Sequence, residues 1–226
     1  MNVLDNLNRV RRQIAATALR AGRDPAQVKL VAVTKTVPVE IIREMLTLGL
    51  DSLGENRAQE LLSKYKELPP GVEWHFIGRL QTNKVKKIID KVSLIHSLDR
   101  WSLALEISRA ACEKGLTARV LVQVNASGEK TKSGLHLQEV EEFVTEASRL
   151  PGLEICGLMT IAPWTENPED VRPVFRQVRD LSLRLQHNLK ARMDCLSMGM
   201  SGDYEVALEE GANVLRIGTA IFGRRV

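Results

Sequence analysis

Strand-like and helix-like segments alternate along the whole chain, and this alternation limits the possible folds more than any other feature. Runs rich in β-branched and apolar residues predict eight strands, at 29–35, 50–55, 73–78, 92–98, 118–125, 153–161, 193–199 and 213–218. Segments with helical patterning lie between them, at 39–49, 56–66, 81–90, 100–115, 137–149, 168–190 and 203–211. Strands separated by helices pair in parallel through right-handed crossovers, so the sequence predicts an α/β fold with a parallel sheet.

Two architectures accommodate this pattern. A doubly wound open sheet usually has a glycine-rich turn after its first strand, but the stretch VAVTKTVP at 31–38 contains no glycine. A closed (β/α)8 barrel needs eight units and places its chemistry at the C-terminal ends of the strands. We therefore predict a single (β/α)8 TIM barrel that forms one domain over residues 1–226.

The composition narrows the class of protein further. With 226 residues, 44% of them hydrophobic, the chain can bury one sizeable core. Its apolar runs fall well short of the roughly 18 residues that a membrane span needs, and its first residues lack the apolar block of a signal peptide. These residues instead predict an extra N-terminal amphipathic helix, with apolar positions at Val3, Leu7, Val10, Ile14 and Leu19.

Cysteines and charges give two more expectations. Cys112, Cys156 and Cys195 are far apart in apolar surroundings, which favours reduced core thiols in a cytoplasmic protein over a disulfide framework or a metal site. The net charge is +4, and lysines concentrate in the segment 83–91. Few aromatic residues lie nearby to stack on bases, so a solvated helix face is favoured over a nucleic-acid patch. We expect neither nucleic acid nor a membrane as a partner, and we expect a monomer.

Polar or small residues gather at the C-terminal ends of the predicted strands. They are Lys35, Glu55, Asn56, His75, Gly78, His96, Ser97, Asn125, Met159, Thr160, Ser197 to Ser201, Arg216, Gly218 and Thr219. In a closed barrel the first and last strands are neighbours, and side-chain alternation then puts Lys35 and Arg216 beside one pocket. Two cations in an apolar cup favour an anion between them. Desolvation and a neighbouring positive charge also lower the pKa of a lysine, which makes it a nucleophile for carbonyls.

The loops after the last two strands, SMGMSGDYE and RIGTAIFG, predict a phosphate site. Their small residues let backbone N–H groups approach an anion, and Ser201 and Thr219 add hydroxyls. A phosphate site together with an aldehyde-reactive lysine points to pyridoxal 5′-phosphate (PLP), with Arg216 meeting the ring nitrogen. Structural interpretations stay open, because Ser201 or Asp203 could cap the seventh helix.

The same holds for two further candidates. Asn56 could be the N-cap of the second helix, and His75 could be a core or rim histidine. The combination of lysine, arginine and phosphate loop is more specific than any of its members.

Several long motifs in order carry a family resemblance. They are LVAVTKTVP, GENRAQE, WHFIGRLQTNK, HSLDR, VLVQVNASGEKTKSGL, GLMTI and LSMGMSGDYEVALEEGANVLRIGTAIFG. Together they resemble the pyridoxal phosphate homeostasis protein family, which is related to the alanine racemase N-terminal barrel. The resemblance covers nearly the whole chain, and it implies a fold-type III barrel with PLP held as a Schiff base on Lys35.

The resemblance also implies roles for other residues by position. Arg216 would meet the pyridine nitrogen, Asn56 would lie near the ring hydroxyl, and the phosphate would lie at Ser201, Gly218 and Thr219. We add His75 and Met200 to the expected cofactor contacts. Many family members carry a second lysine two residues after the Schiff-base lysine, where this chain has Val37.

Two function classes follow, a cofactor carrier and an amino-acid racemase. Arginine at the ring nitrogen keeps that nitrogen unprotonated and weakens the ring as an electron sink. A racemase also needs two opposed bases, but no second domain is expected after the eighth strand, and Tyr204 is expected to pack at the start of its helix.

We therefore expect a carrier with no catalytic residues, which buffers PLP or delivers it to PLP-dependent apo-enzymes. The alternative is a PLP-dependent amino-acid racemase or a related weak amino-acid enzyme. Lys132, in the loop 126–134, could recognise an anion or order a surface turn.

Overall fold

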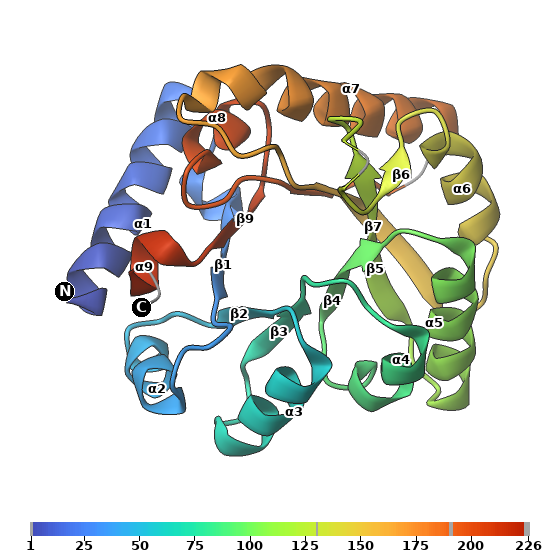
Figure 1. The fold of residues 1–226 in the computed structure, drawn as a ribbon, viewed down its shortest axis with the longest axis horizontal. Coiled ribbons are helices and arrows are strands. Elements are labelled where there is room, and N and C mark those ends of the chain that lie inside the picture. The colour runs from blue at the N-terminus through green and yellow to red at the C-terminus, as the bar shows by residue number, and fades with distance from the viewer. Residues whose placement is uncertain (1, 130, 190–191, 224–226) are drawn as a thin grey trace.

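A ring of eight parallel strands forms the centre of the molecule in the computed structural model, which describes residues 2–129, 131–189 and 192–223 (Figure 1). In chain order these strands are β1 (Lys29–Val33), β2 (Ser52–Glu55), β3 (Glu73–Phe76), β4 (Leu94–Leu98), β5 (Ala118–Asn125), β7 (Leu153–Thr160), β8 (Cys195–Ser197) and β9 (Val214–Ile217). Each pairs with the next, and the β1–β9 pairing closes the ring. The predicted TIM barrel is confirmed.

Helices follow the strands and cover the outside of the ring (Figure 1). They are α2 (Val39–Thr47), α3 (Ala58–Glu67), α4 (Thr82–Ile88), α5 (Trp101–Glu113), α6 (Val140–Ala147), α7 (Arg172–Leu189) and α8 (Tyr204–Glu209). Short 3-10 turns, η1 (Pro25–Gln27) and η2 (Pro168–Val171), precede β1 and α7. Within the described ranges, no helix has the length and apolar character needed to cross a membrane.

Besides η1, two short elements were not predicted, β6 (Leu135–His136) and α9 (Thr219–Phe222). β6 pairs with the end of β5, where Val124 faces Leu135. β7 pairs along the other edge of β5 as far as Val124, so β6 lies on the same edge as β4, whose pairing with β5 reaches only as far as Val122. β6 therefore continues the sheet above β4 and adds to the rim of the barrel on that side.

The N-terminal helix α1 (Val3–Arg20) packs against α8 and α9 (Figure 1). Its buried face includes Leu7, Val10 and Ile14, as predicted, but Leu19 is 66% exposed. Ala18 takes the inward position instead, because it lies four residues after Ile14 on the same helical face whereas Leu19 lies five residues after it. The helix thereby holds the segment that follows β9 against the barrel.

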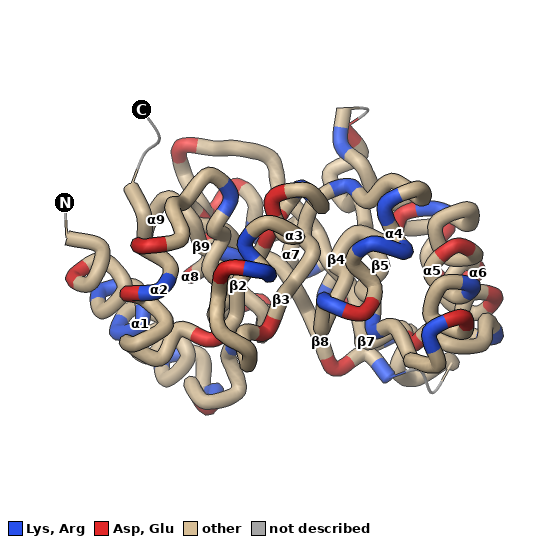
Figure 2. The backbone as a smooth tube through the Cα atoms, turned by 90° about the horizontal axis from the view of Figure 1, so that it is seen from below, with Lys and Arg blue, Asp and Glu red and all other residues tan. Residues whose placement is uncertain are grey.

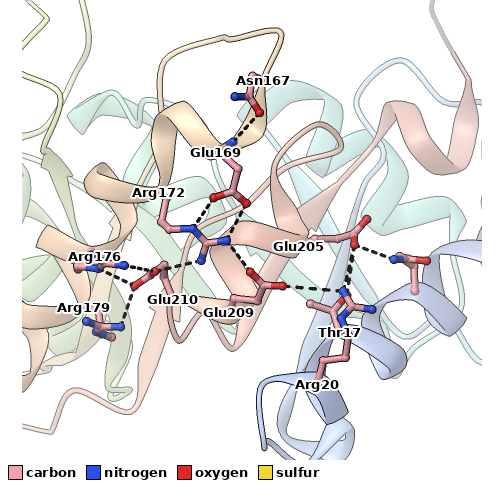
Figure 3. Close-up of polar contacts among 11 residues, drawn as sticks. Thr17, Arg20, Asn167, Glu169, Arg172, Arg176, Arg179, Glu205, Glu209 and Glu210 are labelled. Carbon is pink, nitrogen blue, oxygen red and sulfur yellow. Dashed lines mark hydrogen bonds and ion pairs between the residues drawn. The ribbon is translucent and has the colours of Figure 1, made fainter.

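An ion-pair network joins α1, α7, α8 and η2 (Figure 3). Arg172 contacts Glu169 at 2.6 Å, Glu209 at 2.6 Å and Glu210 at 3.1 Å. Glu210 also accepts hydrogen bonds from Arg176 and Arg179. Because each arginine faces a carboxylate, this network fastens the helices to one another.

The lysine-rich segment around α4 is partly neutralised by neighbouring carboxylates. Figure 2 shows the basic positions of α4 beside acidic positions of adjacent elements. Lys86 lies 2.9 Å from Glu113 of α5, and Lys91 lies 2.8 Å from Asp90. Such pairs at the surface are typical of a solvated helix face, the interpretation that the sequence favoured.

Most of the apolar core lies between the ring and the helices, and a smaller cluster lies inside the ring. The inner cluster comprises Leu94, Leu121, Cys156 and Met159. Buried polar side chains also lie on the strands, among them His75, His96, Ser197 and Arg216. The interior of the barrel is therefore divided between an apolar cluster and a polar group, and the polar group leads to the site described next.

Candidate functional site

Two adjoining cavities open at the C-terminal ends of the strands. The first, of about 310 Å³, is lined by Lys35, Asn56, Met200 and Arg216. The second, of about 380 Å³, is lined by Lys35 again, with Gly218 and Thr219. Six of the eight predicted site residues thus line these cavities, and Lys35 belongs to both.

Strand register places Lys35 and Arg216 together. Val31 of β1 pairs with Arg216 of β9 in the parallel ladder. Side chains alternate along a strand, so Val31, Val33 and the following Lys35 lie on the side of the ring to which Arg216 points. Val33, Lys35 and Arg216 all line the first cavity, which agrees with this placement.

The guanidinium of Arg216 is held inside the barrel. Its side chain is buried, with Nη1 donating to Ser197 Oγ at 2.5 Å and Nη2 donating to the Thr160 carbonyl at 2.8 Å. Burial lowers the pKa of Arg216 to about 10, so the group still carries its charge at neutral pH. Arg216 therefore presents a fixed positive charge beneath the first cavity.

His75 lies in the barrel interior and is not among the described residues that line either cavity. Its Nδ1 is 2.9 Å from His96 Nε2, and His96 Nδ1 is 2.9 Å from Ser197 Oγ. His75 thus reaches Arg216 through two intervening side chains.

The polar row continues toward the N-terminal ends of the strands. His75 Nε2 lies 3.3 Å from Glu73 Oε1, and the other oxygen of Glu73 contacts the Lys29 ammonium. The contact with His75 outweighs burial and, with Lys29, lowers the pKa of Glu73 to about 2. Burial, together with the charges of His75 and Arg216, lowers the pKa of His96 well below its ordinary value of 6.5. A row of polar contacts therefore passes through the ring from Glu73 to Arg216, and it is hydrogen-bonded from His75 onward.

Ser201 links the loop after β8 to the start of α9. Its Oγ accepts hydrogen bonds from the N–H groups of Gly218 at 3.3 Å and Ala220 at 3.1 Å. Ser201 therefore does not cap α8, the helix predicted at 203–211, and its hydroxyl instead accepts from the start of α9. The N-cap position of α8 is Asp203, whose side chain makes no capping hydrogen bond to that helix. The Asp203 carboxylate accepts a hydrogen bond from the Met200 N–H at 2.6 Å, which orders the same loop.

Asn56 lies just before α3 but is not its N-cap, because the helix begins after Arg57. The half-buried Asn56 side chain instead lines the first cavity. Its backbone is approached closely by Gly78, where an added Cβ would lie 2.2 Å from the Asn56 carbonyl oxygen. Glycine at position 78 therefore lets the loop after β3 pack directly on the loop after β2.

The sequence analysis placed Thr160, His96 and Ser197 at strand ends but did not predict the hydrogen-bonded group that they form with Arg216. Ser197 offers a signal, since it is a hydroxyl at the end of the apolar strand β8. Lys132, whose role stayed open, lines the first cavity. It lies between β5 and β6, and β5 is directly across the ring from β1. The cavity therefore has a lysine on each of two opposite sides.

Known proteins resemble this chain along its full length. The family described as alanine racemase, N-terminal domain, matches residues 6–226. A pyridoxal phosphate homeostasis protein of Aquifex aeolicus is 50% identical over 226 residues, which is 100% of this chain and 99% of that protein. Its counterpart in Pseudomonas aeruginosa is 40% identical over 224 residues, covering 99% of this chain and 96% of that protein.

Solved structures give the same picture. PipY of Synechococcus elongatus with PLP bound superposes with a TM-score of 0.83 at 35% identity, covering 95% of this chain and 100% of that one. An alanine racemase of Clostridium difficile has a TM-score of 0.79 at 15% identity, covering 99% of this chain and 57% of that one. The second likeness concerns the fold alone.

Proposed function

Because the chain belongs to the pyridoxal phosphate homeostasis protein family, we propose that it binds PLP and serves in intracellular PLP homeostasis, with the cofactor held as a Schiff base on Lys35. The observation that carries this proposal is the position of Lys35. It lines one cavity with Arg216 and the adjoining cavity with Gly218 and Thr219. An amine, a ring-nitrogen partner and a phosphate site are the three things that a PLP site needs.

The donors present fit the cofactor. A guanidinium has five N–H groups, and Arg216 uses two different nitrogens for Ser197 and Thr160, so N–H groups are left for a ring nitrogen. Ser201 Oγ accepts two backbone hydrogen bonds, so its own O–H proton is available to a phosphate oxygen. Thr219, exposed at the start of α9, adds a second hydroxyl.

The other predicted contacts support the same placement to different degrees. Asn56 and Met200 share the first cavity with Lys35, so both can contact the ring. His75 is separated from Arg216 by His96 and Ser197, so we propose that it acts on the cofactor through this row. When bound, PLP supplies an aldehyde that condenses with the lysine amine with loss of water.

The decisive experiment traps the covalent bond. The protein is incubated with PLP, reduced with borohydride, digested and analysed by peptide mass spectrometry. We expect the cofactor mass on the peptide that contains Lys35, and its loss in Lys35→Ala. A label on Lys132 instead, or no label in the wild-type protein, would contradict the proposal.

We propose a carrier rather than a racemase. Tyr204 is not among the described residues that line the cavities, and burial raises the pKa of its hydroxyl. Charged Arg216 at the ring nitrogen would disfavour a carbanion at a bound amino acid. The names of the relatives, which are homeostasis proteins, agree with this proposal.

The racemase alternative has one structural observation in its favour, because Lys132 lies across the first cavity from Lys35 and could act as the second base. The discriminating assay incubates loaded protein with L-alanine in deuterated water and follows both exchange at Cα and the D-enantiomer. Carriers should give at most slow exchange without inversion. Inversion at roughly 1 per second or faster would overturn the carrier proposal, and loss of that activity in Lys132→Ala would identify the base.

The carrier proposal also implies a delivery step. We propose a one-domain monomer in the cytoplasm that transfers PLP to apo-enzymes. Light scattering should report the mass of one 25.2 kDa chain. A PLP-dependent apo-enzyme mixed with the loaded protein should gain activity faster than with the reduced, trapped protein, in which the cofactor cannot leave. Equal activation by both would argue against transfer.

A further inference from the structure

Both peptide groups that flank Lys35 are hydrogen-bonded to charged side chains of α3. On one side, the Thr34 carbonyl accepts from the Lys64 ammonium at 2.6 Å. On the other side, the Thr36 N–H donates to Glu60 Oε1 at 2.5 Å. Glu60 and Lys64 are four residues apart on one helix and pair with each other at 2.8 Å. One ion pair therefore holds the backbone immediately before and immediately after Lys35.

A second carboxylate completes this group. Glu55, at the end of β2, accepts from Lys64 at 2.8 Å and from the Thr34 hydroxyl at 2.7 Å. Lys64 thus uses three hydrogen bonds, which matches the three N–H donors of an ammonium. The side chains of Glu55 and Lys64 are 0% and 7% exposed. We call Glu55, Glu60 and Lys64 the clamp.

Packing α3 against the end of β1 through buried charges costs hydration free energy. Buried ion pairs lose hydration, and apolar residues of similar size often stabilise a fold as well or better. Ala58 and Leu61 precede Lys64 on the buried face of α3, and the buried Leu68 follows at the C-cap, so an apolar residue would continue the pattern. A lysine at this position therefore calls for a reason other than core packing.

The turn at 34–37, which the clamp holds at both flanking peptide groups of Lys35, has a strained backbone. Thr36 has a φ of 63°, the only positive value among the described non-glycine residues. A β-branched residue is strained in this conformation, and such strain persists only where the surroundings enforce it. The Val37 N–H also donates to the Thr34 carbonyl at 2.9 Å, which closes a tight turn around Lys35.

We propose that Glu55, Glu60 and Lys64 are positioning residues that hold the turn 34–37 in its strained form and thereby direct the Lys35 side chain into the two cavities. This inference rests on the proposed role of Lys35 as the residue that bonds the cofactor. The clamp acts through the backbone, so its effect exists before any ligand binds. It therefore has a readout in the apo-protein that is separate from cofactor binding.

The first measurement is amide hydrogen exchange at Thr36 in the apo-protein, followed by NMR. Glu60→Ala removes the acceptor of the Thr36 N–H, and Glu60→Gln keeps an oxygen there. Loss of one hydrogen bond to a charged group should raise the exchange rate in Glu60→Ala roughly tenfold or more. The rate should stay near that of the wild type in Glu60→Gln. Equal exchange rates in Glu60→Ala and the wild type would overturn the proposal.

The second measurement is the rate at which visible absorbance appears when PLP is added. Glu60→Ala should load roughly tenfold more slowly, and Glu60→Gln should recover most of the rate. The control is Glu210→Ala, which breaks another carboxylate cluster, with Arg172, Arg176 and Arg179, outside the turn. A similar slowing in Glu210→Ala would mean that general destabilisation is responsible, and the proposal would fall.

A third variant removes the buried charges together. Glu55→Gln with Lys64→Met leaves no unpaired ammonium, so the protein should stay folded. Thr36 keeps its acceptor on Glu60, so its exchange rate should rise less than in Glu60→Ala, whereas loading should still slow because the Thr34 carbonyl has lost Lys64. Borohydride labelling separates the two proposals. An unlabelled wild type would refute the role of Lys35, whereas a labelled wild type with unchanged clamp variants would refute the clamp alone.

Discussion

Ser197 on β8 accepts a hydrogen bond from Arg216 on the neighbouring strand β9, with 2.5 Å between Oγ and Nη1. The same oxygen lies 2.9 Å from His96 Nδ1, so one hydroxyl of β8 fixes both a guanidinium and an imidazole. The orientation of the Arg216 guanidinium is therefore fixed by β8. Ligand binding does not have to organise it.

Ser197→Ala should destabilise the fold. The change leaves the buried Arg216 Nη1 and His96 Nδ1 without this partner, which costs about 1–3 kcal/mol of unfolding free energy. Urea unfolding measures the effect. Ser97→Ala is the matched control, because the buried Ser97 Oγ lacks a hydrogen-bond partner among the described residues and its removal should cost little. Equal losses in the two variants would show that the hydroxyl of Ser197 has no special role.

Stability should fall as the pH drops below 6.5. The folded protein favours neutral His96, whose pKa is lowered by burial and then by the charges of His75 and Arg216, so below 6.5 the unfolded chain binds more protons. Each pH unit below 6.5 should then cost up to about 1.4 kcal/mol. Glu73 adds a further loss only from about pH 4.5 downward, because its carboxylate binds a proton there in the unfolded chain, whereas in the folded protein its pKa of about 2 keeps it ionised.

His96→Gln isolates this effect between pH 6.5 and 5. Its unfolding free energy should depend less steeply on pH than that of the wild type, as measured by urea titrations at several pH values. His187→Gln, a change at an exposed position on α7, should keep the wild-type slope. An unchanged slope in His96→Gln would assign the pH dependence to other groups.

Thr219→Asp should weaken PLP binding. A carboxylate at this exposed position, beside Gly218, would repel a phosphate in the second cavity. The apparent affinity should drop more than roughly tenfold, while the circular dichroism spectrum stays native. Thr219→Ser, which keeps the hydroxyl, should bind PLP nearly as the wild type does. Undiminished affinity in a folded Thr219→Asp would move the phosphate elsewhere.

Thr36→Asn should stabilise the protein. Asparagine tolerates the left-handed conformation that Thr36 adopts at φ 63°, and relief of about 1 kcal/mol of strain would raise Tm by about 2–4 °C. Thr47→Asn, an exposed change at the end of α2 where φ is not positive, should bring no such gain. Calorimetry distinguishes the two. A lower Tm in Thr36→Asn would mean that the side chain matters more than the backbone.

The barrel itself could be predicted because every unit has a clear period. All eight ring strands lie within the segments expected from their apolar runs. β6 and α9 could not be predicted because they have two and four residues, too few to show alternation or a helical face. Leu19 was placed in the core by counting apolar residues, whereas the helical face includes Ala18.

The residues at the rim of the candidate site could also be predicted from the sequence. Lys35 and Arg216 follow from alternation on two strands that ring closure makes neighbours. Contacts that cross the ring, such as His96 with Ser197, depend on strand tilt and stagger, which no local pattern records. Lys64 did leave a signal, since it interrupts an apolar helix face, but its partners Thr34, just after β1, and Glu55, on β2, could be known only from packing.

The pairing of β1 with β9 determines when the candidate site can form during folding. Lys35 follows the first ring strand, whereas Arg216 and Thr219 belong to or follow the last, so nearly the whole sequence separates partners that share two cavities. During synthesis, the lysine emerges long before anything exists to receive its ligand. If these cavities hold PLP as proposed, only a chain whose barrel has closed can bind it. Occupancy of this site would therefore report that folding is finished.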